Sequence, residues 1–95
     1  MTEVFRYKTT LYESDWKRLN GTEYAQRIHI DELSVKNKTI ININFLEIDN
    51  IDQEGKAKKI FDYIRFAIRK NCLSFYMYKA NIPIIDIPIM IIQYK

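Results

Sequence analysis

The sequence predicts an α+β domain with a mainly antiparallel sheet and one amphipathic helix packed on it. Three observations favour this class. Several segments alternate apolar and polar residues with the period of two that is typical of strands, most cleanly Tyr24–Asp31. One segment, from Gln53 or Glu54 to about Asn71, has the apolar spacing of a helix. The last segment, Asp86–Tyr94, is apolar on both faces of a strand.

Length and composition indicate one ordinary domain. The chain has 95 residues, enough for one hydrophobic core, and 47% of them are hydrophobic. Ile, Leu, Val and Phe are abundant and the net charge of +3 is small for this length, which argues against an intrinsically disordered chain. No apolar run approaches the ~20 residues that span a bilayer, and the first residues lack the pattern of a secretory signal. We therefore expect that the protein is made in the cytoplasm and that it does not insert into a membrane.

Before the helix, β-branched and aromatic residues predict three strands, which are Val4–Trp16, Tyr24–Asp31 and Thr39–Ile48. Asn20-Gly21 marks a turn after the first strand, because this pair tolerates positive φ. Leu33–Lys38 is polar and typical of a loop. After the helix we expect two strands, Leu73–Tyr78 and Asp86–Tyr94, which gives the order βββαββ in a single domain.

Apolar residues recur at i, i+3, i+4 and i+7 in the predicted helix and form one stripe for burial. The stripe consists of Ala57, Ile60, Phe61, Ile64, Ala67 and Ile68. Asp52 and Glu54 lie at its start and Arg69-Lys70 at its end, as the helix dipole favours. Asn71 fits a C-cap. Pro88 cannot donate a ladder hydrogen bond, so it predicts that part of the last strand lies at a sheet edge.

The two-sided apolar strand at the C-terminus predicts self-association. A strand that is apolar on both faces needs cover on both, and a chain this short rarely supplies two covering layers itself. A second copy is the natural source of the missing layer. We therefore expect an oligomer interface formed by aromatic and apolar residues of the last two strands and of the segment between them: Tyr76, Tyr78, Ile84, Ile87, Ile89, Met90, Ile91 and Ile92.

Residues that could carry chemistry are few, and we expect no catalytic, cofactor-binding or metal-binding residues. His29 is the sole histidine; it has Asp31 two residues on, but a position on the wet face of a strand explains it. Cys72, the only cysteine, follows the predicted helix C-terminus, where the dipole disfavours a thiolate. The acids of Glu47–Glu54 lack the spacing of a calcium loop. Trp16 fits a core or interface position.

Basic and aromatic residues raise the alternative of a nucleic-acid partner, which the sequence does not favour. The predicted helix carries Lys56, Lys58, Lys59, Arg65, Arg69 and Lys70, and the chain has 7 tyrosines. Phosphate contacts and base stacking use such residues. The solvent face of a helix is normally rich in lysine and arginine, however, and no nucleic-acid-binding signature accompanies these. A solvated helix face is the simpler interpretation.

Several short motifs, read together, resemble a known family. They are Thr9-Thr10-Leu11 with Ser14-Asp15-Trp16, Tyr24-Ala25-Gln26, the helical residues Ala57 to Arg65, Asn71-Cys72-Leu73-Ser74-Phe75-Tyr76, and the closing Pro83-Ile84-Ile85-Asp86-Ile87-Pro88-Ile89. This order resembles small proteins from the tail regions of phages and prophages of Gram-positive bacteria. Those proteins often have a Gly- and Ser-rich segment after the tryptophan, whereas Lys17–Glu23 is charged here.

The resemblance implies a non-enzymatic virion protein of the tail or adsorption apparatus. Such a protein is made in the host cytoplasm and assembled into the virion as a homo-oligomer, a trimer or hexamer. Its partners would be copies of itself, other phage tail proteins and a host cell-surface polymer. The alternative that the sequence leaves open is a phage-encoded binding module that acts on a host protein or on nucleic acid.

Overall fold

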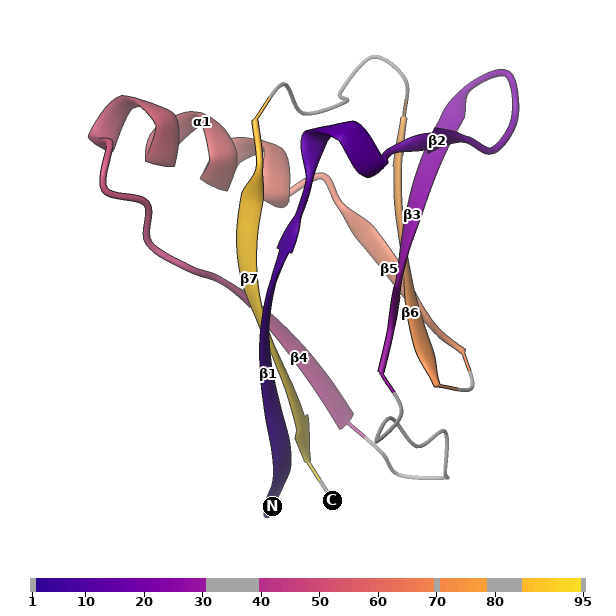
Figure 1. Ribbon diagram of the computed structural model, residues 1–95, viewed down its shortest axis with the longest axis vertical. Helices are drawn as coiled ribbons and strands as arrows, with labels where there is room; N and C mark the ends of the chain where they lie inside the picture. The colour runs from indigo at the N-terminus through magenta and orange to yellow at the C-terminus, as the bar shows by residue number, and fades with distance from the viewer. Residues whose placement is uncertain (1, 31–39, 70, 79–84, 95) are drawn as a thin grey trace.

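A computed structural model describes residues 2–30, 40–69, 71–78 and 85–94, and the statements below refer to these residues (Figure 1). This part of the chain contains seven strands, one α-helix and one 3-10 turn. In chain order they are β1 (Glu3–Leu11), η1 (Glu13–Asp15), β2 (Lys17–Arg18), β3 (Glu23–His29), β4 (Ile40–Phe45), α1 (Ile51–Phe61), β5 (Arg65–Arg69), β6 (Cys72–Tyr78) and β7 (Ile87–Tyr94).

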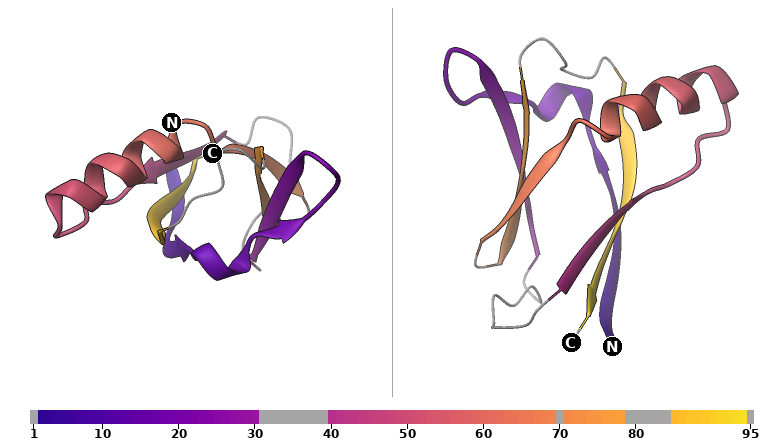
Figure 2. Two further views of the ribbon diagram at one scale, coloured as in Figure 1. Left: turned by 90° about the horizontal axis from the view of Figure 1, so that it is seen from above. Right: turned by 180° about the vertical axis from the view of Figure 1, so that it is seen from behind.

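The strands form two sheets. One has three strands in the order β1-β7-β4, and the other has four in the order β2-β3-β6-β5. All of these pairings are antiparallel. The two sheets face each other, as the view from above in Figure 2 shows, and enclose one hydrophobic core. The predicted α+β class with a mainly antiparallel sheet and one helix is therefore confirmed.

The core is built from alternate residues of facing strands. Side chains at every second position of β7 and β6 point between the sheets and are almost completely buried, as the period of a strand requires. The core consists of Leu11, Trp16, Ile30, Ile41, Ala57, Leu73, Phe75, Met77, Ile87, Ile89 and Ile91. Trp16 is thus a core residue, one of the two positions that the sequence favoured.

The order of elements differs from the predicted βββαββ, because four strands precede the helix and three follow it. The first predicted strand, Val4–Trp16, is divided: β1 ends at Leu11, and η1 and the short β2 follow. The remaining strand predictions differ from the structure by few residues. The predicted loop Leu33–Lys38 lies outside the described residues.

The prediction that the helix continues to about Asn71 is wrong. α1 ends at Phe61, where Tyr63 N–H donates to the Ile60 carbonyl at 2.9 Å and Ile64 N–H to the Phe61 carbonyl at 3.0 Å. Such i to i+3 bonds tighten the last turn of a helix. Ala57 is fully buried, and the ring centroid of Phe61 lies 5.9 Å from that of Phe45. Asn50 caps the start, its side chain accepting from Gln53 N–H.

Residues 65–69 form β5 instead, paired with β6. Phe66 and Ile68 face the core side while Arg65 and Arg69 lie on the other face, since Phe66 pairs with Phe75 and Arg65 with Tyr76. Ile64, Ala67 and Ile68 fit the spacing of a helix, whereas Phe66 and Ile68 fit the alternation of this strand, so a short apolar run is compatible with both periods. Asn71 has φ 59° and lies in the turn between β5 and β6, not at a helix end.

β7 is the central strand of its sheet and lies between β1 and β4 from Ile89 to Tyr94. Only its first residues, Ile87 and Pro88, pair with β1 alone. The carbonyl of Pro88 accepts from Leu46 N–H at 3.0 Å, and β4 ends next to it. Since a proline cannot return that hydrogen bond, the ladder with β4 ends here. The prediction of an edge position is therefore wrong for most of β7, and even at Pro88 the strand has β1 on one side and Leu46 on the other.

Candidate functional site

The structure separates the residues that the sequence assigned to one oligomer interface. Ile87, Ile89 and Ile91 point between the two sheets and are 0% exposed. Met90 and Ile92 lie on the opposite face of the same strand, and Tyr76 and Tyr78 belong to the other sheet. Ile84 lies outside the described residues. These side chains therefore do not form one continuous surface.

For Ile87, Ile89 and Ile91 the argument that a second copy must supply cover is wrong. The four-stranded sheet of the same chain covers them, chiefly through Leu73, Phe75 and Met77 of the shared core. The sequence argument missed this layer because it counted a single sheet. No second copy can contact these three side chains unless the core opens.

The opposite face of β7 is covered from within its own sheet. Met90 pairs with Lys8 and Asn44, and Ile92 pairs with Arg6 and Asn42. Directly opposed residues of antiparallel strands share a face, so β7 carries an apolar stripe between two polar borders. The aliphatic stems of lysine and arginine can cover such a stripe while their charges stay in water. Met90 is half-buried and Ile92 is 6% exposed.

A more exposed apolar region lies between the edge strands β4 and β5. A groove of about 250 Å³ opens there, which we call the apolar groove; it is lined by Ile43, Phe61, Asp62, Ile64, Phe66 and Phe75. Phe66 is 42% exposed, and its ring centroid lies 6.5 Å from that of the buried Phe75. Among the residues that the structure describes, β4 and β5 are each the last strand of their sheet, so one side of each backbone has no strand partner there. The sequence hid this groove because it placed Ile64 and Phe66 on the helix.

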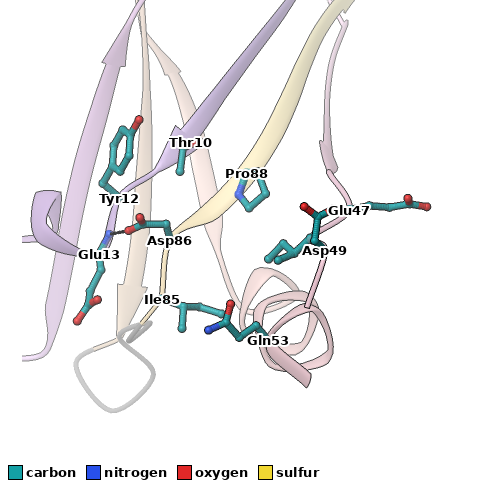
Figure 3. Close-up of a pocket in the computed structure, with 10 residues that line it drawn as sticks. Thr10, Tyr12, Glu13, Glu47, Asp49, Gln53, Ile85, Asp86 and Pro88 are labelled. Atoms are coloured by element: carbon teal, nitrogen blue, oxygen red, sulfur yellow. Dashed lines mark hydrogen bonds between the residues drawn. The ribbon is translucent and has the colours of Figure 1, made fainter. Parts of the chain in front are cut away.

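A larger hollow, of about 610 Å³, lies where β7 begins (Figure 3). It is lined by residues of and near β1 and η1, of the segment between β4 and α1, of α1, and of and before the start of β7: Thr10, Tyr12, Glu13, Glu47, Ile48, Asp49, Gln53, Ile85, Asp86 and Pro88. Four of these are acidic. No group of three or more His, Cys, Asp or Glu side chains in the described residues is arranged to hold a metal ion.

Residues of three of the sequence motifs meet at the segment that crosses from one sheet to the other. Asp86 accepts a hydrogen bond from Glu13 N–H at 2.8 Å, as Figure 3 shows. The side chain of Gln26 donates to the Tyr12 carbonyl at 3.3 Å. Leu11 and Trp16, at the two ends of the segment, are buried in the core. These motif residues therefore fix a corner of the fold, and their spacing has a structural cause.

His29 and Cys72 are direct cross-strand partners in β3 and β6. The sequence paired His29 with Asp31, which lies outside the described residues. His29 is exposed, Cys72 is half-buried, and neither residue lines the two hollows described above. Arg69 is the next side chain in the row, opposite Cys72.

Comparison of the chain with protein-family models, curated protein sequences and solved structures finds no match. Within the described residues, no helix has the length and apolar character that crossing a membrane requires.

Proposed function

We propose that this protein is a non-enzymatic structural component of a phage or prophage tail. It is made in the host cytoplasm, is assembled into the virion, and acts by binding copies of itself and neighbouring tail proteins. The resemblance of its motifs to small tail-region proteins supports the phage context. The observation that carries the assembly role is the apolar groove between two edge strands.

Unpaired strand edges beside exposed apolar side chains favour association. An edge strand presents N–H and C=O groups that can pair with another chain, and monomers usually protect such edges. Here Phe66 of β5 is 42% exposed, and Ile43 of β4 lines the same groove. A second copy that pairs with one of these edges would cover both the backbone and the groove. The contact would therefore bury apolar and hydrogen-bonding groups together.

The charges on β5 favour a ring over a two-fold dimer. If β5 paired antiparallel with itself about Ala67, Arg65 would stand opposite Arg69 of the second copy. Like charges directly opposite each other destabilise a strand pair. A contact between β5 and a different surface of the next copy avoids this repulsion. Contacts of that kind generate closed rings when the rotation closes, so we propose a trimer or hexamer.

Light scattering on the purified protein tests the assembly role. The expected mass is three or six times the 11.5 kDa of the chain. Phe66→Asp places a charge in the groove, so it should reduce the mass to that of a monomer while the far-ultraviolet spectrum stays unchanged. Leu19→Asp is the matched control, since Leu19 is also an exposed apolar residue but lies away from the groove. A parent that is monomeric at all micromolar concentrations contradicts the proposal.

A further inference from the structure

The outer face of the four-stranded sheet is basic and aromatic. Residues of this face share the side of the sheet that points away from the core, as the pairings show. One row across the sheet runs from Lys17 through Ala25 and Tyr76 to Arg65, and a second runs from Arg27 through Ser74 to Ala67. Tyr78, Glu23 and Arg69 extend the same face. We call this surface the basic face.

Two arginines belong to this surface because residues 65–69 form a strand and not the end of the helix. The sequence placed Arg65 and Arg69 on a solvated helix with Lys56, Lys58 and Lys59. In the structure the two arginines lie on β5, in the same sheet as Arg27 and Tyr76. Cations and aromatic rings that are scattered along the chain therefore share one side of one sheet.

The charge of the basic face is strongly positive. Lys17, Arg27, Arg65 and Arg69 stand against one acid, Glu23, which already pairs with Arg65 at 3.2 Å. The face continues into a hollow of about 460 Å³ beside β2, lined by Asp15, Lys17, Arg18, Leu19, Ala25, Gln26, Arg27 and Tyr76. Three of its lining residues are cationic and one is acidic. A groove of this charge attracts an anionic chain.

The two tyrosines offer ring faces between the cations. Tyr76 and Tyr78 are two residues apart on β6, which spaces them by roughly 7 Å on the same side of the sheet. Tyr78 is 50% exposed, and the guanidinium of Arg65 lies 4.7 Å from its ring centroid. Ala25, directly opposite Tyr76, is small and partly exposed, whereas Ser74 is buried. Flat ligand groups can therefore stack along β6.

We propose that the basic face binds single-stranded nucleic acid. The bases would stack on Tyr76 and Tyr78, and Lys17, Arg27 and Arg69 would contact phosphates, a combination typical of sequence-tolerant single-strand binding. A duplex hides its base faces, so it offers only its phosphates. Other polyanions lack flat rings. This activity goes beyond the proposed assembly role and uses another surface.

Fluorescence anisotropy with a labelled oligothymidylate of about twenty nucleotides tests the proposal, since such a strand exceeds the site of one small domain. Tyr76→Ala should weaken binding by about tenfold, the usual effect of losing one stacking platform. Tyr76→Phe keeps the ring and should bind as the parent does. If Tyr76→Ala does not fold, the exposed Tyr78 gives the same test through Tyr78→Ala.

The charges are tested by Lys17→Ala combined with Arg27→Ala. The logarithm of the binding constant falls linearly with the logarithm of the salt concentration, and losing two phosphate contacts should reduce the magnitude of that slope by about 1.4. The matched control is Lys58→Ala combined with Lys59→Ala, which removes the same charge from α1 and should leave binding unchanged. Light scattering on each variant separates this result from the assembly role.

Three outcomes would overturn the proposal. One is no binding at about 100 μM, the weak end of non-specific affinities. Another is a duplex or polyphosphate that binds as tightly as the single strand, which would mean that charge alone is recognised. The last is an equal loss of binding in the control variant on α1, Lys58→Ala combined with Lys59→Ala.

Discussion

Single side chains hold the segment that carries the chain from one sheet to the other. Between Leu11 and Trp16 the backbone leaves β1 and enters the four-stranded sheet. Gln26 and Asp86, which are distant in sequence, each bind one backbone group of this segment. Backbone groups outside a ladder need such partners, because an unpaired one costs free energy when it is buried. The corner is thus defined by two polar side chains and two buried apolar ones.

Asp86→Ala should lower the free energy of unfolding by about 1 kcal/mol, because the Glu13 N–H loses its acceptor. Asp86→Asn keeps an oxygen at that position and should retain most of the stability. Chemical denaturation measures both values. Asp49→Ala is the control, since Asp49 is an exposed acid that lines the same hollow. If Asp86→Ala and Asp49→Ala lower the free energy of unfolding by the same small amount, this hydrogen bond does not fix the corner.

The sequence identified residues that hold the corner between the two sheets, but not the contacts through which they hold it. It singled out Trp16, Gln26 and Asp86 as parts of a motif, but it gave no contact between them. The contacts depend on which strands pair, and Glu13 and Asp86 are brought together only by the pairing of β1 with β7. A chain read by itself shows side-chain periods and not pairings, so this corner could not be predicted.

At the scale of elements, one short apolar segment has a spacing that does not distinguish a helix from a strand. The stripe from Ala57 to Phe61 is helical in the structure, whereas its continuation to Ile68 is a strand. Five residues that alternate are too few to distinguish the two periods, and tertiary pairing with β6 decides the outcome. The strands with clean alternation, such as β3, were predictable because one face carries Tyr24, Gln26 and Ile28, which are buried or half-buried, and the other carries the exposed Arg27 and His29.

The short helix depends on one tightly packed position. Ala57 is fully buried, whereas Lys56 and Lys58 beside it are exposed. Ala57→Leu should destabilise the fold by about 1–3 kcal/mol, because the added carbons must fit into a filled core. Lys56→Leu adds an apolar side chain in the same helix turn and should change stability little. Thermal melts compare the two, and equal melting temperatures would contradict the packing of α1 through Ala57.

At the scale of the whole molecule, the protein covers its most apolar strand with its own second sheet. The prediction of a self-associating chain began from the two apolar faces of the C-terminal strand. The structure gives one face to the core and borders the other with Arg6, Lys8, Asn42 and Asn44. Composition and period could indicate that both faces needed cover. They could not indicate that the cover came from the same chain.

The two faces of β7 therefore predict different results for matched double substitutions. Ile89→Asp with Ile91→Asp puts two carboxylates into a core where both positions are 0% exposed. A charge buried without a partner is too costly for a domain of this size, so this variant should not fold. Circular dichroism should show no cooperative melt.

Met90→Asp with Ile92→Asp makes the same chemical change on the other face. Lys8 stands opposite position 90 and Arg6 opposite position 92, so each new carboxylate has a cationic neighbour. Met90 is half-buried and Ile92 is buried, but the cross-strand neighbours Lys8 and Arg6 are exposed, so the variant should fold and melt at a lower temperature than the parent. If this variant also fails to fold, or if the Ile89 and Ile91 variant melts like the parent, the assignment of the two faces is wrong. The difference between the two melts thus measures how completely the second sheet, and not another copy, buries the inner face of β7.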